Sequence, residues 1–148
     1  MIKVKALVAD DSKVMRGIVM TTLRGSQLAE FEFIEAENGE EALEKFNPNE
    51  IDMVFIDWNM PKMTGVDFTR KARGKAGAQD TPIVLVTSEK AMGKMEMALD
   101  EAGASAYVCK PFTSEDIVRK IGKFIEMIGE KKQKTSRGGF FGKLLGGG

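Results

Sequence analysis

Acidic, hydroxyl and ammonium side chains stand where the apolar runs of this chain end. Asp10 and Asp11 follow the first run, and Asp57 follows the run at 53–56. Thr87 closes the next run, and Lys110 closes the last one. If these runs are parallel strands, their carboxyl ends meet at one edge of a sheet and the five side chains converge. Such a set would hold a divalent cation and a phosphoryl group.

The ligand chemistry of these side chains favours Mg²⁺. Three neighbouring carboxylates repel one another, so a cation must occupy the site or some of the acids must be protonated. The chain has no histidine and one cysteine, which leaves oxygen ligands, and these suit Mg²⁺. A carboxylate beside Mg²⁺ can attack a phosphoryl donor, while the ammonium group of Lys110 offsets charge on the phosphoryl oxygens. A cis bond between Lys110 and Pro111 would aim the lysine back over the site.

Taken singly, each residue also has a structural interpretation. Asp10, Asp11 or Ser12 would cap the first helix, Asp57 would be a turn residue, and Lys110 would be a solvated lysine at a strand end. The chemical interpretation depends on all of them meeting at one sheet edge.

Five apolar runs alternate with segments of helical periodicity. This (βα)5 pattern predicts an α/β fold with an open, doubly wound parallel sheet. The run at 31–36 alternates with acids and fits an edge strand, whereas the continuous runs at 53–56 and 83–86 fit the centre. A flavodoxin-like strand order 2-1-3-4-5 satisfies these constraints and places Asp10, Asp11 and Asp57 at the switch point.

The helical segments carry their own signals. In the first, four apolar residues are predicted to share one helical face: Val14, Ile18, Val19 and Leu23. The fourth is marked by Met92, Met95, Leu99 and Ala102 and is predicted to end at Gly103. Thr113 is predicted to cap a long final helix whose inner face carries Ile117, Ile121, Phe124, Ile125 and Ile128.

Charge divides the chain into two parts. The 148 residues have a net charge of zero, but from Lys131 onward there are five basic residues and no acids. Residues 1–130 therefore carry 17 basic and 22 acidic side chains, a net charge of −5, which argues against a body that binds nucleic acid. We predict a domain at 1–130 and a basic, Gly-rich tail at 131–148.

The tail and the remaining composition lead to further expectations. The FFGKLL segment is either part of a flexible extension or a docking peptide for a partner, a second copy or this chain's own fourth-helix surface; an anionic membrane is a third option. The chain opens without a signal peptide and has no apolar stretch long enough to span a membrane, so we expect a cytoplasmic protein.

Taken together, the motifs resemble a response-regulator receiver domain, most closely its stand-alone chemotaxis members. The resemblance covers about residues 4–128 in unbroken order. It rests on the Asp10–Asp11 pair, on Asp57 within DWNMPKMTG, on Thr87–Ser88, and on Tyr107 two residues before CKPF at 109–112.

The resemblance implies a role for each site residue. Asp57 would accept a phosphoryl group from a histidine kinase or a small phosphodonor. Asp11, Asp57 and the backbone carbonyl of Asn59 would bind Mg²⁺, with Asp10 helping directly or through water. Lys110 would pair with the phosphoryl oxygens. The protein would be no ordinary enzyme, because it would catalyse only its own phosphorylation and dephosphorylation.

The resemblance also implies a switch. Thr87 would hydrogen-bond to the phosphoryl group, and the ring of Tyr107 would turn into the space that Thr87 vacates. This would alter the surface of the fourth helix, fifth strand and fifth helix, where a target protein binds. Asn59, Ser88 and Glu89 would modulate the lifetime of the phosphoryl group. Gly65 and Pro111 would have structural roles.

Other functions fit the motifs less well. A haloacid-dehalogenase-type phosphatase needs Asp-x-Asp after the first strand, whereas this chain has Asp-Asp-Ser. The first turn lacks the glycines of a dinucleotide site, and GGFFGK at 138–143 departs from a P-loop. A flavin-binding module remains an analogy of shape. Within the receiver class, the alternative is a phosphorelay intermediate or phosphate sink without a motility target.

Overall fold

The computed structural model describes residues 1–88, 99 and 101–144, and the side chains of these up to residue 134. The elements are β1 (Lys3–Ala9), α1 (Lys13–Gly25), β2 (Glu30–Ala36), α2 (Gly39–Lys45), β3 (Met53–Asp57), α3 (Gly65–Arg73), β4 (Ile83–Ser88), β5 (Ala106–Lys110) and α5 (Ser114–Leu144). Met92 and Met95 of the expected fourth helix lie outside the described residues. Its predicted end is confirmed, because the Gly103 N–H donates to the Leu99 carbonyl and Gly103 has a φ of 82°.

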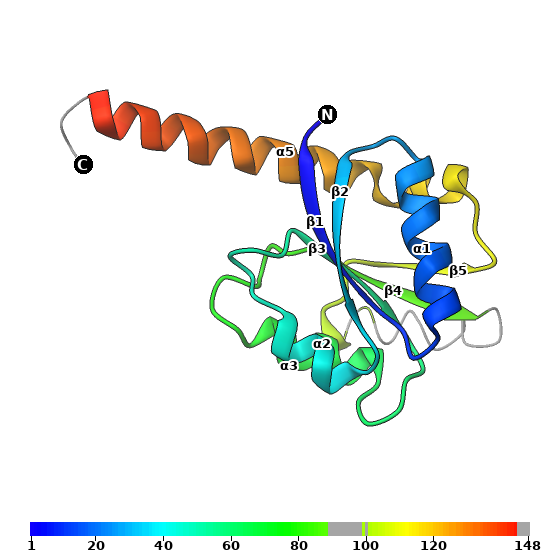
Figure 1. The fold of residues 1–148 in the computed structure, drawn as a ribbon. Coiled ribbons are helices and arrows are strands. Elements are labelled where there is room, and N and C mark those ends of the chain that lie inside the picture. Colours follow the sequence, from blue (N-terminus) through cyan, green and yellow to red (C-terminus); the bar gives the residue numbers. More distant parts are fainter. Residues whose placement is uncertain (89–98, 100, 145–148) are drawn as a thin grey trace.

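The described strands form one parallel sheet in the order β2-β1-β3-β4-β5, which confirms the predicted fold class (Figure 1). β2 lies at an edge, as its alternating sequence predicts. β1 is an interior strand that pairs with both β2 and β3, so the chain reverses its direction of winding between β1 and β3. The carboxyl ends of β1 and β3 are therefore the switch point.

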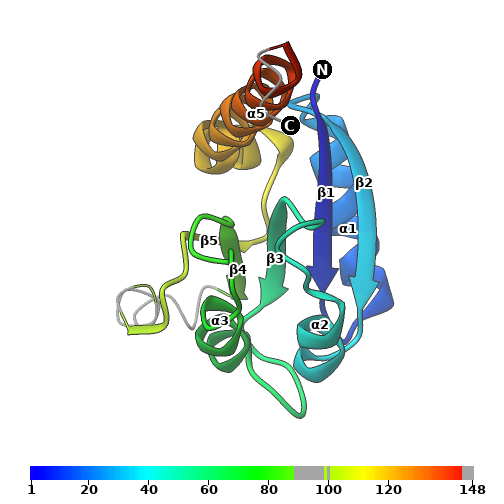
Figure 2. The same ribbon diagram turned by 90° about the vertical axis from the view of Figure 1, so that its left-hand side faces the viewer.

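Helices cover both faces of the sheet (Figure 2). On one face, Phe68 and Ala72 of α3 and Ala42 of α2 pack against alternate strand residues, and on the other face α1 and α5 do so. The central strands contribute to both cores. Val54 and Ile56 of β3 belong to the first core, and Met53 and Phe55 to the second, which explains the unbroken apolar sequence.

The prediction that four apolar residues of α1 share one face was partly wrong. Val19 and Leu23 are buried, but Val14 is 74% exposed and Ile18 is 46% exposed. With 3.6 residues per turn, Val19 and Leu23 lie close to Arg16 on the helix, and Arg16 is the third buried residue. The centre of the buried face is therefore rotated away from Val14 and Ile18, whose side chains remain at the surface.

Side-chain caps fix the helix starts. The hydroxyl of Ser12 accepts the Met15 N–H, so Ser12, rather than either neighbouring aspartate, caps α1. Thr113 caps α5 as predicted, accepting the Asp116 N–H through its hydroxyl at 3.1 Å. In return the Thr113 N–H donates to the Asp116 carboxylate at 2.9 Å, which lowers the pKa of Asp116.

The last helix is longer than the sequence predicts. Among the side chains that the structure describes, Ile128 is the last buried apolar residue of α5, but the helix continues to Leu144 and projects beyond the sheet (Figure 1). The predicted boundary at residue 130 therefore falls within a helix. Among the described residues, no helix is long and apolar enough to cross a membrane.

Candidate functional site

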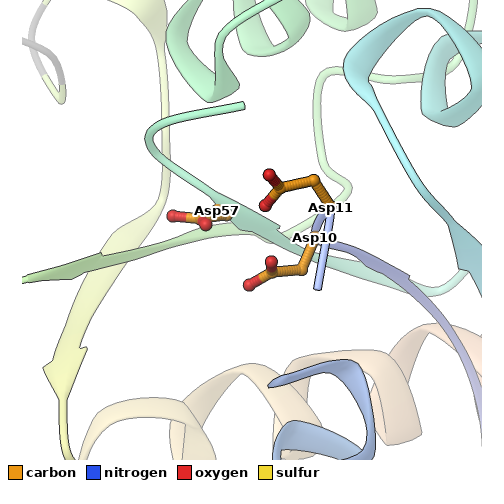
Figure 3. A group of neighbouring side chains, drawn as sticks. All are labelled: Asp10, Asp11 and Asp57. Carbon is orange, nitrogen blue, oxygen red and sulfur yellow. The ribbon is translucent and has the colours of Figure 1, made fainter. Parts of the chain in front are cut away.

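Three carboxylates meet at the switch point. Asp10 directly follows β1, and Asp57 ends the neighbouring strand β3, whose residue Ile56 pairs with Ala9. One carboxylate oxygen from each of Asp10, Asp11 and Asp57 lies within 4.8 Å of the other two (Figure 3). Asp10 is buried and Asp57 is half-buried, whereas Asp11 is exposed. The three carboxylates therefore converge as the strand ends predict.

Lys110 reaches the same cluster from β5. Its Nζ lies 3.4 Å from Asp10 Oδ2 and 3.5 Å from Asp57 Oδ2. The Lys110–Pro111 peptide bond is cis, the form considered from the sequence. One ammonium group therefore contacts the two less exposed carboxylates.

The charges of the cluster do not balance. Three carboxylates and one ammonium group leave two negative charges, and each carboxylate pair repels by roughly 3–4 kcal/mol at an effective dielectric constant of about 20. The exposed Asp11 leaves the cluster open to solvent. All the acidic donors are oxygens, as Mg²⁺ prefers, and their spacing allows one ion to contact all three. The residues therefore fit a hard divalent cation.

Close packing behind Asp57 fixes its backbone. A Cβ on Gly65 would lie 2.5 Å from the Asp57 carbonyl oxygen, so only glycine fits at the start of α3. The Gly65 N–H donates to Trp58 O at 3.1 Å, and the Asn59 N–H donates to Asp57 Oδ1 at 3.3 Å. The loop after Asp57 is anchored further by the buried side chain of Met60. The predicted structural role of Gly65 thus has a steric basis.

Arg16 supports the site and was missed in the sequence. Its Nη1 donates to the Asp10 carbonyl oxygen at 2.6 Å, and its Nε donates to Glu35 Oε1 at 3.0 Å. The side chain is buried, so α1 holds the backbone of Asp10 with a charged hydrogen bond. The signal was available: Arg16 lies three and seven residues before the buried Val19 and Leu23, which places a charge on the inner face of the helix.

The predicted switch residues lie on β4 and β5. Thr87 is fully buried and follows Val86, the partner of Asp57 in the β3–β4 pairing. Its hydroxyl donates to the Ser88 carbonyl at 3.2 Å. Tyr107 is half-buried on β5, and Lys120 Nζ lies 4.8 Å from its ring centre. Ser88 is exposed at the end of β4 and pairs with Lys110, and Glu89 lies outside the described residues.

A doubly wound domain with an acidic cluster and a lysine at its switch point belongs to a class of folds that bind their ligands at the carboxyl ends of the strands. The model of the response regulator receiver domain matches residues 6–122, and the chain belongs to that family. This confirms the resemblance found in the sequence.

Several relatives are chemotaxis proteins. The chain is 41% identical to chemotaxis protein CheY1 of Helicobacter pylori over 118 residues, which cover 79% of this chain and 93% of that protein. It is 38% identical to the CheY homolog of Campylobacter jejuni over 118 residues, 79% of this chain and 88% of that protein. The crystal structure of CheY4 from Vibrio cholerae aligns with a TM-score of 0.69 at 30% identity and covers 79% of this chain and 94% of its own.

Proposed function

We propose that this chain is a stand-alone response regulator that is phosphorylated on Asp57 by a histidine kinase in a Mg²⁺-dependent reaction. The phosphorylated form then binds a target protein in chemotaxis or motility signalling. The observation that carries the proposal is the meeting of Asp57 with Asp10, Asp11 and Lys110. The chain matches CheY proteins over most of their length, and this similarity supports the chemotaxis role.

Asp57 is the nucleophile of the proposed reaction. One of its carboxylate oxygens forms a bond to phosphorus, while the bond from phosphorus to the donor imidazole nitrogen breaks and the imidazole leaves with the electron pair. Lys110 Nζ, 3.5 Å from Asp57 Oδ2, is close enough to pair with the transferred oxygens. Water later cleaves the acyl phosphate and regenerates the carboxylate.

Three acids would hold the metal. Asp11 is accessible at the rim, while Asp10 and Asp57 lie deeper, and the backbone carbonyl of Asn59 would complete the protein's ligands. Bound Mg²⁺ would neutralise charge on the phosphoryl oxygens. Arg16 would keep Asp10 in place through its carbonyl oxygen, 2.6 Å from the guanidinium.

The switch would begin at Thr87. Its hydroxyl now donates to a neutral carbonyl, that of Ser88, and a phosphoryl oxygen on Asp57 would be a charged and therefore stronger acceptor. A turn of Thr87 toward Asp57 frees space for the ring of Tyr107. Because Tyr107 contacts Lys120 of α5, the change would reach the surface formed by the fourth helix, β5 and α5.

The exposed apolar side chains of α1 support a protein as phosphodonor. Val14 and Ile18 are one helical turn apart on the helix that begins two residues after Asp11. A kinase domain that delivers a phosphoryl group to Asp57 must cover this rim of the site. We expect it to bury the two side chains.

Two-dimensional NMR of the labelled protein with acetyl phosphate and Mg²⁺ tests the switch. Wild type should show shifted amide signals at Thr87, Tyr107 and Lys110, and Asp57→Asn should show none of these shifts. Identical spectra with and without acetyl phosphate would refute the switch. A wild type that shifts but mainly returns its phosphoryl group to a histidine, with no target that prefers the phosphorylated form, would be a relay or phosphate sink.

A further inference from the structure

The connection between β2 and α2, residues 36–39, contacts the two segments that carry the acids of the site. At one end, the carbonyl oxygen of Ala36 accepts the N–H of Asp10 at 3.1 Å. At the other end, Gly39 begins α2 and packs against Met63 in the loop of residues 58–64 that follows Asp57. The proposed reaction uses no residue of this connection, yet the connection joins the segment of Asp10 to the segment of Asp57.

Only glycine fits at position 39. A Cβ there would lie 2.5 Å from the carbonyl oxygen of Met63 and 2.6 Å from its Cβ. Both atoms move only with the backbone of the loop, so no change of rotamer would relieve the overlap. Gly39 is buried, and the Met63 side chain packs in the same core as Ala36 and Ala42. The loop can approach α2 this closely because residue 39 has no side chain.

The backbone of the loop is strained next to this contact. Lys62 has a φ of 69°, in the left-handed region that residues with side chains rarely adopt. The Met63 N–H donates to the Pro61 carbonyl at 2.8 Å, which closes a three-residue turn around Lys62. Such a conformation persists only where the surrounding structure imposes it. Here the buried side chains of Met60 and Met63 and the packing against Gly39 impose it.

The strained loop carries one side of the candidate metal site. Asn59, whose backbone carbonyl would bind the ion, belongs to this loop, and its N–H donates to Asp57 Oδ1 at 3.3 Å. On the other side of the site, Asp11 directly follows Asp10, whose N–H is bonded to the connection. The connection therefore fixes the spacing between the two sides, because one end holds Asp10 and the other end holds the loop.

We propose that Gly39 is a positioning residue that sets the size of the metal site and so its preference for Mg²⁺ over the larger Ca²⁺. This inference rests on the proposed function, in which Mg²⁺ binds among the three acids. Mg²⁺ requires oxygen ligands at about 2.0–2.1 Å in near-octahedral geometry, whereas Ca²⁺ accepts about 2.3–2.6 Å and variable geometry. A methyl group at position 39 pushes the loop away from the connection, which widens the site and penalises the smaller ion.

Titrations with Mg²⁺ and with Ca²⁺, followed through the amide NMR signals of Asp11 and Asn59, test the proposal. Gly39→Ala should raise the Mg²⁺ dissociation constant at least about tenfold and the Ca²⁺ constant less than about threefold. Partial unfolding would scale both constants alike, so their ratio reports the position of the loop and not stability. Gly77→Ala is the matched control, because Gly77 has a φ of 86° in the loop before β4, at the other end of the sheet. Its ratio should equal that of wild type.

Met63→Ala provides a second variant should Gly39→Ala fail to fold. It removes the side chain that holds the loop in the core, so it should also weaken Mg²⁺ binding more than Ca²⁺ binding. Its control is Met53→Ala, which truncates a fully buried methionine at the start of β3 and should leave the ratio unchanged.

A wild-type ratio of the two constants in Gly39→Ala, or in Met63→Ala where only that variant folds, would overturn the proposal. A wild type that binds neither ion would overturn it together with the Mg²⁺ dependence of the proposed function. The titrations need no phosphodonor. A chain that binds Mg²⁺ but does not accept a phosphoryl group on Asp57 would therefore contradict the proposed function alone.

Discussion

Lys110 and Asp57 are 53 positions apart in the sequence, yet Lys110 Nζ lies 3.5 Å from Asp57 Oδ2. The strands that carry them are separated in the sheet by β4. The contact therefore depends on three adjacent parallel strands ending at the same edge. The site is a property of the whole sheet and of no single segment.

Replacing Lys110 with methionine should slow phosphoryl acceptance from acetyl phosphate roughly 100-fold, because the ammonium group that offsets charge on the phosphoryl oxygens is lost. Intact mass measured at successive times gives the rate. Lys71→Met, which removes an exposed lysine of α3, should react at the wild-type rate. A Lys110→Met rate equal to that of this control would remove Lys110 from the mechanism.

Gly65→Ala should destabilise the fold by about 1–3 kcal/mol, because its methyl group would overlap the Asp57 carbonyl oxygen. The matched control is Gly17→Ala in α1, where nothing lies within 4 Å of the added carbon. That change should stabilise the protein by about 0.5–1 kcal/mol, because alanine favours a helix. Urea unfolding measures both. Equal stability of the two variants would refute the steric role of Gly65.

Arg16→Gln should cost roughly 2–3 kcal/mol of folding free energy, because it removes a buried, charged donor to the Asp10 carbonyl and the ion pair with Glu35. It should also weaken Mg²⁺ binding, measured by calorimetry, because Asp10 loses its support. In Arg119→Gln, an exposed ion pair with Asp116 is lost, and both quantities should change little. Unchanged Mg²⁺ affinity in Arg16→Gln would limit Arg16 to a role in stability.

The reciprocal hydrogen bonds between Thr113 and Asp116 at the start of α5 should make a small contribution to the loss of folding stability in acid. The Thr113 N–H lowers the pKa of Asp116 in the folded state, so this contribution is present above the unfolded pKa of the carboxyl group. The contribution is lost as the pH falls through the pKa of Asp116 in the folded protein, which lies below the ordinary pKa of an aspartate. Carboxyl carbon NMR should show a lower titration midpoint for Asp116 in the native protein than in urea. A native midpoint equal to or above the unfolded one would contradict this.

The sheet and most of the site were predictable, because continuous apolar strands and the residues that follow them are both visible in a sequence. The same reasoning failed for α1. Val14 and Ile18 are apolar, but the face they share is opposite to the one that packs on the sheet, and hydrophobicity alone does not distinguish the two. Arg16 was missed because a buried arginine looks like a surface charge until its partners, Glu35 and the Asp10 carbonyl, are known.

The length of α5 was a different case. Glycines at 138, 139 and 142 have low helix propensity, so the sequence favours an end of the helix near residue 130. The structure continues the helix to Leu144, and Lys132, in the turn that follows residue 130, forms an ion pair with Asp52. A side chain 80 positions away thus contributes to an element that local propensity disfavours.

The most direct test of the central claim is the intact mass of the protein after incubation with acetyl phosphate and Mg²⁺. Wild type should gain the mass of one phosphoryl group, and peptide mapping should place it on Asp57. The gain should be absent when EDTA removes the metal and absent in Asp57→Asn. A wild type that gains no mass, or an Asp57→Asn variant that gains as much as wild type, would contradict the assignment of Asp57 as the phosphoryl acceptor.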